Sequence, residues 1–594
     1  MYWFNTRDGV CVKFKLVLFI LFLILVTGCA SADVNITVGY PGNTGNYTTD
    51  GINDEVQISQ AINAAISAGG GTVYLKGPNT YWIANPIDIY GSNLIITGDS
   101  TAELKLNSSL TWEAGVPLFN IHSTYENVSV IGFTIDGNRD QQSHGQGTNY
   151  HTFISSWRAE NITVSNMRLE YGLGDGLRVE QCNNITFSNN DVYKLGHEGM
   201  YALNTNNTQS YGNTILVWAD AGIRLMGSSH GKIYNNTIYS EIDADSTGPL
   251  IKLDEYYEYN GIKDVEIYNN KLYTSNGAGI LIDCIYENDT LYVEDIYIHH
   301  NTIANTGQYS YNTGYTDSGI VIGNANNTTI ENNVIDSCGK SGIKWGSVDF
   351  VYIDEAPVPI DTTQARNFTT IVRNNVITGS ISEEGFLHSG AGIWNTNTTY
   401  AHFIVENNDI YNNTLGQFYP ASGDWLSESN NLNASPLFVN TTATYSNRDY
   451  HLKSTAGRWN GTDWVNDTVN SPLIDAGYVL SPYTNEPEPN GDRINIGVYG
   501  NTIYASKSLL TITELTPWSR MGDNLESDIH STFKLAGTLL IVILGIAILT
   551  ILIGLVTNTI RIDQAIIAVL IVMVCSIFLV IAVVLLSEMY TFLG

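Results

Sequence analysis

Charged and aromatic residues recur at a fixed spacing around three glycines in the middle of the chain. The glycines are Gly176, Gly199 and Gly222, so one interval is 23 residues. The residues that could do chemistry lie one or two positions before each glycine and two positions after it. They are Asp175, Arg178, His197, Glu198, Tyr201, Asp220 and Arg224. If each interval is one coil, stacked about 4.8 Å from the next, these side chains form a patch about 10 Å across.

Two reactions on sugar chains fit these residue types. Hydrolysis needs two carboxyl groups, about 5 Å apart for retention or about 6.5–9.5 Å apart for inversion, and Asp175, Glu198 and Asp220 straddle both ranges. Elimination from a uronic acid needs a base such as His197 or Tyr201, with arginines or a cation to neutralise the sugar carboxylate. The spacing does not decide between the two reactions. A soluble protein also shows polar columns on its surface, so a non-catalytic role stays open.

Two intervals beside this patch are longer than the 23-residue period and could form its walls. The interval that ends at Asn166 and the one that ends at Asn270 are both 34 residues long. The extra length of the first would bring Arg139 and His151 over the patch. Acidic residues in the second include Glu241, Asp243, Asp245, Asp254 and Glu255. Acidic loops can hold calcium, but no regular ligand spacing is present, so calcium stays open as a cofactor and we assign no metal ligand.

These observations give a set of predicted roles. The predicted catalytic residues are Asp175, His197, Glu198 and Asp220, and the predicted substrate-binding residues are Arg178, Tyr201, Arg224, Arg139, His151 and Trp394. Trp394 stands two residues after Gly392, which is the outward position of a later interval. There it could stack on a sugar or pack beneath a loop.

Short strands must position these residues, because no helix-length apolar segment interrupts the intervals. A 23-residue interval with two or three short alternating runs is typical of a parallel β-solenoid in which one repeat makes one coil. One asparagine recurs in each interval, and its buried amide could bond to its copies in the adjacent coils. The predicted ladder comprises Asn166, Asn190, Asn213, Asn236, Asn270, Asn301, Asn333, Asn375 and Asn408.

An amphipathic helix is predicted over residues 55–68, where it could cover the open end of the solenoid. Its apolar face comprises Val56, Ile58, Ala61, Ile62, Ala65 and Ile66, and strands are predicted at residues 72–75, 81–84 and 94–97. The stretch DGINDEVQISQAINAAISAGGGTVYLKGPNTYWI resembles the first segment of pectate-lyase-like right-handed β-helix proteins. With the coils, the resemblance covers residues 48–430 and implies an all-β fold, a right-handed parallel β-helix over residues 33–430.

The resemblance is informative about fold and much less so about chemistry, because that superfamily includes lyases, hydrolases, epimerases, tailspikes and proteins without catalysis. Neither the Asn-Thr-Asp and Asp-Asp pattern of polygalacturonase-like hydrolases nor the calcium-site aspartates of pectate lyases can be matched. The phrases GHEGMYA, ADAGIRL, IYIHHNTI and TTIENNVI also resemble the β-helical region of disaggregatase-associated proteins of methanogenic archaea. That resemblance implies an extracellular polysaccharide as the partner.

The C-terminal part of the chain has a different pattern. Residues 431–505 resemble the closing segment of secreted β-helix proteins and are expected to cover the far end of the solenoid. Residues 506–534 are predicted to form a tether. The uncharged apolar runs 535–556 and 565–586 are each long enough for a transmembrane helix. Arg561 in the loop between them favours the cytoplasmic side for that loop.

Residues 1–29 combine a basic start with a short apolar run, which predicts a secretory signal peptide with a possible lipidation site at Cys29. The predicted location is therefore the cell membrane, with the β-helix outside the cell. Many Asn-x-Ser/Thr sequons make glycosylation of that part an expectation. The formal net charge of −31 argues against a nucleic-acid partner, and the six cysteines lack the spacing of a zinc or redox motif.

Overall fold

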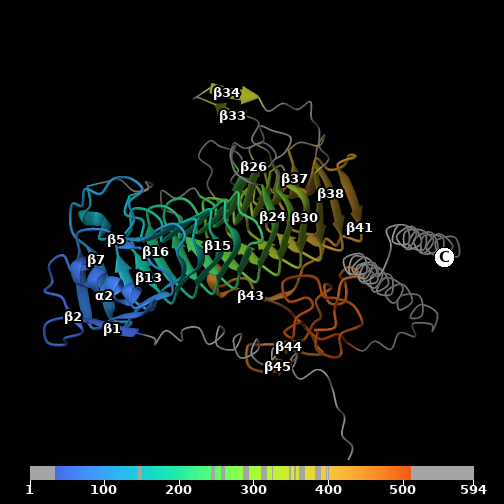
Figure 1. Ribbon diagram of the computed structural model, residues 1–594. Helices are drawn as coiled ribbons and strands as arrows, with labels where there is room; N and C mark the ends of the chain where they lie inside the picture. Colours follow the sequence, from blue (N-terminus) through green and yellow to red (C-terminus); the bar gives the residue numbers. More distant parts are fainter. Residues whose placement is uncertain are drawn as a thin grey trace, which may run out of the picture. The chain divides into compact units, whose positions relative to one another are not determined.

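The computed structural model describes residues 34–509, except for residues 144–149, 242–247, 256–260, 285–292, 309–316, 324, 347–349, 354–355, 360–367, 382–388, 397 and 399–400 (Figure 1). The described residues fall in a compact unit that ends at Leu509. The predicted signal peptide, most of the predicted tether and both predicted transmembrane runs lie outside them. Within the described ranges, no helix has the length and hydropathy that a bilayer span requires.

Three long parallel sheets form the body of this unit, and the chain passes through them in turn (Figure 1). The first sheet comprises β2 (Tyr47–Thr48), β1 (Val34–Gly39), β3 (Gly71–Leu75), β6 (Leu94–Gly98), β9 (Glu126–Ile131), β12 (Glu160–Ser165), β15 (Asn183–Ser188), β18 (Asn206–Tyr211), β21 (Lys232–Tyr234), β24 (Ile262–Tyr268), β27 (Val293–His299), β30 (Ala325–Glu331), β35 (Phe368–Arg373), β38 (Ala401–Glu406) and β41 (Leu426–Ser429). The second sheet comprises β4 (Asn79–Ile83), β7 (Ala102–Leu106), β10 (Thr134–Asp136), β13 (Arg168–Glu170), β16 (Asp191–Leu195), β19 (Thr214–Val217), β22 (Thr237–Ser240), β25 (Lys271–Tyr273), β28 (Thr302–Ala304), β31 (Val334–Asp336), β36 (Val376–Thr378) and β39 (Asp409–Tyr411). The third sheet comprises β5 (Ile87–Ile89), β8 (Phe119–Ile121), β11 (Ile154–Trp157), β14 (Leu177–Glu180), β17 (Met200–Leu203), β20 (Ile223–Met226), β23 (Ile251–Glu255), β26 (Ile280–Cys284), β29 (Ile320–Ile322), β32 (Ser341–Trp345), β37 (Ala391–Asn395) and β40 (Gly416–Tyr419).

Successive strands of each sheet pair in parallel at the spacing that the sequence predicts. Leu177 of β14 pairs with Met200 of β17, and Met200 pairs in turn with Ile223 of β20. Along each strand, alternate residues point into the core, so Leu177 and Val179 are fully buried. The predicted parallel β-helix is therefore confirmed.

Short elements complete the described structure. They are the hairpin β33 (Phe350–Ile353) and β34 (Ala356–Pro359), the antiparallel pairs β42 (Phe438–Asn440) with β43 (Asp449–Leu452) and β44 (Arg458–Trp459) with β45 (Trp464–Val465), and the short helices η1 (Arg139–Gln141) and η2 (Tyr445–Asn447).

The asparagine ladder is present from Asn190 to Asn431. Each backbone N–H in it donates to the side-chain Oδ1 of the asparagine in the next coil, over 2.8–3.0 Å. The prediction is wrong for Asn166, because Met167 holds the ladder position of that coil and donates its N–H to Asn190. Asn166 stands one residue earlier, in line with Asn189, where the backbone has a left-handed φ of 54°. In an Asn-Asn pair such as Asn189 and Asn190, the first residue therefore adopts the left-handed backbone conformation at the turn, and the second belongs to the ladder.

Helix α2 (Glu55–Ser67) packs against the first coils, as expected for a cap. Ile58, Ala61, Ile62 and Ala65 are buried on its inner face. Val56 does not belong to that face, because 47% of it is exposed. In the first turn, the buried residue is instead Glu55, whose carboxylate accepts hydrogen bonds from the backbone of Ala84 and the amide of Asn85.

Residues 431–509 contact the flank of the coils. Three side-chain amides of the coils donate hydrogen bonds to this segment: Asn332 to Asn495 and Gly497, Asn374 to Ser481, and Asn407 to Ala476 and Gly477. The His300 ring bonds to the carbonyl of Gly500. Val334 and Val376 on the outer face of the second sheet pack against its apolar residues Tyr450, Leu452, Leu473 and Ile496. The segment thus lies along the flank of four successive coils and shields the outward apolar side chains of two of them. Its expected role as a cover of the far end stays a prediction.

Candidate functional site

The predicted outward column is present on the third sheet. Arg178 of β14 pairs with Tyr201 of β17, which pairs with Arg224 of β20, which pairs with Lys252 of β23. The glycines that precede these strands allow the coils to pack closely. A Cβ atom on Gly199 would lie 2.6 Å from the carbonyl oxygen of Gly222, closer than any side chain tolerates.

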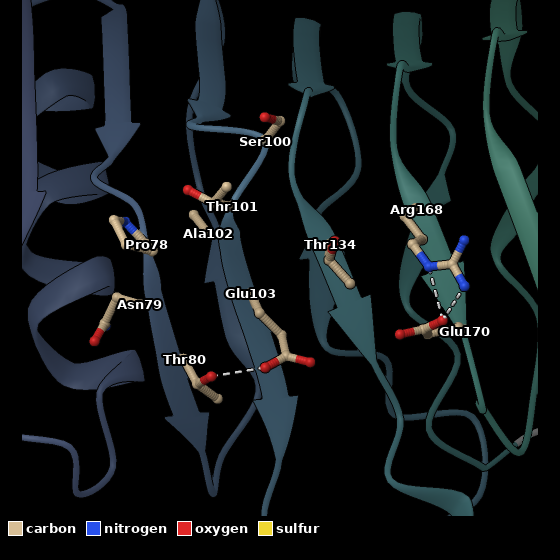
Figure 2. Close-up of a pocket in the computed structure, with 10 residues that line it drawn as sticks. All are labelled: Pro78, Asn79, Thr80, Ser100, Thr101, Ala102, Glu103, Thr134, Arg168 and Glu170. Carbon is tan, nitrogen blue, oxygen red and sulfur yellow. Dashed lines mark hydrogen bonds and ion pairs between the residues drawn. The ribbon is translucent and has the colours of Figure 1, made fainter.

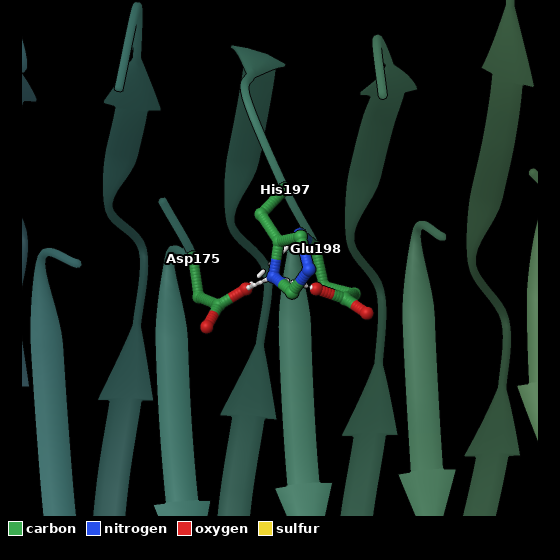
Figure 3. A group of neighbouring side chains, drawn as sticks. All are labelled: Asp175, His197 and Glu198. Atoms are coloured by element: carbon green, nitrogen blue, oxygen red, sulfur yellow. Dashed lines mark hydrogen bonds and ion pairs between the residues drawn. The ribbon is translucent and has the colours of Figure 1, made fainter. Parts of the chain in front are cut away.

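Asp175, His197 and Glu198 meet at the turn that leads into the third sheet (Figure 3). The Nδ1 atom of His197 lies 2.6 Å from Oδ1 of Asp175 and also makes an ion contact with Oε2 of Glu198. The same Asp175 oxygen accepts the backbone N–H of Glu198 over 3.1 Å. One ring N–H donates to one acceptor at a time, so the hydrogen bond goes to Asp175 and the approach to Glu198 is ionic.

Burial and charge fix the protonation of this group. The side chains of Asp175 and Glu198 are 0% exposed, and that of His197 is 17% exposed. Burial alone would lower the pKa of His197, but the hydrogen bond to Asp175 and the negative charge of Asp175 and Glu198 raise it to about 10. Burial alone would raise the pKa of Asp175, yet the contact with His197 leaves it below its usual value. His197 is therefore an imidazolium at neutral pH.

Arginines neutralise the buried carboxylates on their other sides. Nη1 of Arg224 lies 2.9 Å from Oε1 of Glu198, while its Nε and Nη2 atoms contact Asp254 over 3.1 and 2.5 Å. Nη1 of Arg178 lies 3.4 Å from Oδ2 of Asp175. Asp254 is fully buried and was placed by the sequence only among acidic loop residues. Its role as a partner of Arg224 follows from the strand register. Asp254 pairs with Met226, two residues beyond the pair of Arg224 and Lys252, so its side chain lies on the same outer face as theirs.

Tyr201 lies between the two arginines. The guanidinium carbons of Arg178 and Arg224 are 4.5 and 4.8 Å from its ring centroid. Only 6% of Tyr201 is exposed, and its hydroxyl donates to the sulfur of Met226 over 2.9 Å. Burial raises the pKa of Tyr201 in spite of the two arginines. It therefore serves as a neutral spacer between cations.

Asp220 is the carboxylate of this group that solvent reaches. Its side chain is 34% exposed, and its contact with the group is an Nη1 to Oδ2 distance of 3.7 Å from Arg224. It occupies the same place before Gly222 as His197 does before Gly199, one coil further on. The described structure thus gathers seven predicted residues with Lys252 and Asp254.

Three other predicted residues lie elsewhere. The expectation that Arg139 and His151 lie over this patch is wrong, whereas Trp394 lies on a later coil, as its place in the sequence predicts. Arg139 donates to the carbonyl of Lys194 over 2.6 Å, and its guanidinium carbon lies 5.2 Å from the ring centroid of Trp218. His151 is fully buried, with its ring edge-on to Trp112, so it cannot line a groove. Trp394 stands five strands beyond Arg224, about 24 Å away, and faces Lys344 and Tyr419.

A metal ion is the other occupant to consider for the group of Asp175, His197 and Glu198. Each residue offers one ligand atom, and these atoms lie within 4.8 Å of one another. One imidazole and two carboxylates would suit zinc or manganese rather than calcium, which prefers oxygen ligands alone. Arg178 and Arg224 already neutralise the remaining carboxylate oxygens, however, and repel a further dication. The residues fit a protonated histidine better than a metal.

Two family models match the chain. The model described as "right handed beta helix region" matches residues 71–238 and 152–284, and the one described as "disaggregatase related" matches residues 262–477. Both agree with the resemblances seen in the sequence, and the first supports the right-handed sense of the coils. No curated protein sequence matches the chain.

Solved structures share the fold at low sequence identity. The mannuronan C-5 epimerase AlgE6 A-module of Azotobacter vinelandii is 18% identical, with a TM-score of 0.50 over 65% of this chain and 97% of that one. The GH87 α-1,3-glucanase catalytic unit of Streptomyces thermodiastaticus is 16% identical (TM-score 0.40; 62% and 66% covered). The surface adhesin PfbA of Streptococcus pneumoniae is 14% identical (TM-score 0.36; 71% and 96% covered). The likeness to the epimerase module shows the fold alone and leaves the chemistry to the residues of this chain.

Proposed function

We propose that this protein binds an acidic polysaccharide across the outer face of the third sheet and cleaves it by β-elimination. One observation carries the proposal: the group presents cations toward solvent and keeps its carboxylates beneath them. Arg178, His197, Arg224 and Lys252 all have partly exposed side chains, whereas Asp175, Glu198 and Asp254 are fully buried. A surface of this kind attracts the carboxylate of a uronic acid.

Hydrolysis is supported less well by the same geometry. A glycosidase places two carboxyl groups on either side of the bond it cuts, so both must reach the substrate. Asp175 and Glu198 have no exposed surface, and both are occupied by His197 and the arginines. Their arrangement supports a positioning role in which they hold the cations in place.

The spacing of the cations suits an extended chain of sugars. Arg178 and Arg224 stand two coils apart, about 9.6 Å along the stack, which is close to the length of a disaccharide. Tyr201 fills the coil between them and keeps the two guanidinium groups apart. A polysaccharide that lies along the stack could therefore pair acidic groups with both arginines.

The proposed elimination uses three kinds of group. Asp220, the exposed carboxylate, removes the proton from C5 of the uronate, and Arg224 pairs with the carboxylate of that sugar, which takes up the developing negative charge. Arg178, two coils away, pairs with the carboxylate of another sugar of the chain. The C4–O bond then breaks, its electron pair passes to the leaving oxygen, and the imidazolium of His197 protonates that oxygen. The products are a new chain end and a sugar with a C4–C5 double bond.

We further propose that the β-helix acts outside the cell, held at the membrane by the two apolar runs of the C-terminal part. The support is the sequence alone: the signal-like first residues and the uncharged runs 535–556 and 565–586. An enzyme of this kind would act on polysaccharide close to the cell surface.

The test uses the full-length protein with polygalacturonate, alginate and hyaluronan, and with dextran as a neutral control. Reducing ends and the ultraviolet absorbance of unsaturated uronates are measured together. Cleavage of an acidic polymer with a matching rise in absorbance supports the proposal. Reducing ends without that absorbance would indicate hydrolysis, and binding without cleavage would indicate a display protein; either result overturns the proposed reaction.

A further inference from the structure

We propose that the second sheet carries a separate carbohydrate-binding site for an uncharged oligosaccharide. The site lies on the outer face of the first four strands of that sheet, β4, β7, β10 and β13, and shares no residue with the group around His197. It would let the protein hold a neutral glycan while the third sheet engages an acidic one.

A pocket of about 520 Å³ marks this site (Figure 2). Its lining is almost entirely polar and comprises Pro78, Asn79, Thr80, Ser100, Thr101, Ala102, Glu103, Thr134, Arg168 and Glu170. Four of these carry hydroxyl groups, which both donate and accept hydrogen bonds, as sugar hydroxyls do. The volume is within the range of small-molecule sites and large enough for a few sugar rings.

Glu103 and Arg168 are held in place by neighbouring side chains and can make further hydrogen bonds. The hydroxyl of Thr80 donates to Oε2 of Glu103 over 2.7 Å, and the structure gives no donor for Oε1 among the described residues. Arg168 is held by Glu170, with Nη2 to Oε2 at 2.7 Å, and by an ion pair with Asp191 on the next strand. A carboxylate with a free oxygen and a held guanidinium can bind neighbouring hydroxyls of a sugar without ordering new side chains.

An exposed tryptophan stands at the edge of this polar surface. Trp82 lies on β4 two residues beyond Thr80, so both side chains point to the outer face. It is 37% exposed, and its backbone N–H is fixed by a 2.9 Å hydrogen bond to Asp54. Sugar rings bind by placing their C–H faces on aromatic rings while their hydroxyls meet polar groups. Trp82 with Glu103 and Arg168 supplies both kinds of contact.

The charge of the site selects against acidic sugars. Three carboxylates lie on these four strands, those of Glu103, Asp136 and Glu170, against the two cations Lys105 and Arg168. Glu103, Asp136 and Glu170 are close enough to share an ion, with ligand atoms within 4.8 Å. Lys105 pairs with Asp136 and Arg168 with Glu170, so the net negative charge of this face is that of Glu103. A neutral, hydroxyl-rich ligand is the one that this balance accepts.

Calorimetric titration of the full-length protein tests the site, with cellohexaose, xylohexaose and N-acetylchitohexaose as neutral probes and polygalacturonate as the acidic one. We expect at least one neutral hexaose to bind. Trp82→Ala and Glu103→Gln should each raise its Kd about tenfold or more, the scale of one lost stacking or charged contact. Trp157→Ala is the matched control, because Trp157 is a tryptophan with similar exposure (46%) on the third sheet. Thermal unfolding of each variant shows that it has folded.

Three results would overturn this inference. One is that none of the neutral hexaoses binds at millimolar concentration. Another is that Trp82→Ala and Glu103→Gln, both folded, bind as tightly as the natural chain. The third is that His197→Ala abolishes binding of the neutral probe, which would place it on the third sheet. Failure of the acidic-polysaccharide reaction leaves the inference intact, because polygalacturonate and the neutral probes report on different sheets.

Discussion

The Nδ1 atom of His197 lies 2.6 Å from Oδ1 of Asp175 across one coil boundary, and the aspartate is wholly buried. Because that carboxylate and Glu198 hold the ring in its charged form, the histidine is a fixed cation. This relationship changes the chemistry expected of the site. His197 is ready to give a proton, and the part of the base falls to the exposed Asp220.

The raised pKa of His197 predicts a dependence of stability on pH. A folded-state pKa of about 10, above the unfolded value of 6.5, means that the contribution of His197 is complete below the unfolded pKa and is lost as pH rises through about 10. In urea unfolding, the natural chain should exceed His197→Gln in stability at about pH 6, and the gap should shrink at about pH 10.5. An equal gap at both pH values would contradict the charged histidine.

Because Asp175 is buried, its replacement should lower the free energy of unfolding, which replacement of an exposed carboxylate would not do. Asp175→Asn leaves His197 and Arg178 without their buried counter-charge, so we expect the free energy of unfolding to fall by about 3 kcal/mol. The matched control is Asp220→Asn, whose side chain is 34% exposed and whose change should be within about 0.5 kcal/mol. Equal stability of the two variants in urea unfolding would refute the buried network.

The ladder predicts a stability effect without any effect on chemistry. Asn213 receives the N–H of Asn190, and its own amide donates to Asn236 and to the carbonyl of Phe187. Asn213→Leu should therefore lower stability by about 1–3 kcal/mol, since neighbouring polar groups lose a buried partner. Asn206→Leu, an exposed position in the same coil, should change stability little. Chemical unfolding compares the two, and a neutral Asn213→Leu would argue against a structural ladder.

The 23-residue spacing alone predicted the coil and the outward column of Arg178, Tyr201 and Arg224. When each strand repeats in the same register, these residues lie side by side, whatever the conformation of the turns. It did not predict how deeply the residues at the turn are buried. The position just before each glycine turns inward, so Asp175 and Glu198 lie under the sheet surface instead of on it.

The remaining errors of the sequence-based site and ladder predictions arise where the chain departs from the 23-residue interval. Asp254 follows Arg224 by 30 residues, through a lengthened coil, so no repeat position identified it as the partner of Arg224. His151 has a left-handed φ of 54° at the end of a loop, and its ring turns into the core against Trp112. The ladder prediction fails at Asn166 because Met167 replaces the second asparagine of the pair, and a single asparagine in the sequence fits either position.

The proposed topology predicts where an added protease cuts. If the β-helix lies outside the cell and residues 535–586 form the anchor, trypsin added to intact cells should release a large fragment by cutting near Arg520 in the predicted tether. Lys507 should resist, because its backbone bonds to Gly457 and its ammonium lies 4.6 Å from the ring centroid of Trp464. Release only after the cells are lysed would place the β-helix on the inner side.

Variants of the third-sheet group separate catalysis from binding. His197→Ala and Asp220→Asn should each lower kcat at least about 100-fold on an acidic polysaccharide that the natural chain cleaves, because one supplies and the other removes a proton. Arg178→Ala should chiefly raise KM by weakening the hold on the polysaccharide, whereas Arg224→Ala should also lower kcat, because Arg224 neutralises the charge that develops in the reaction. Arg224 also pairs with buried Glu198 and Asp254, so Arg224→Lys is the conservative comparison and should retain more stability than Arg224→Ala. Initial rates over a range of substrate concentrations measure both constants. If His197→Ala and Asp220→Asn keep full kcat while folded, the bond is cleaved elsewhere on the protein.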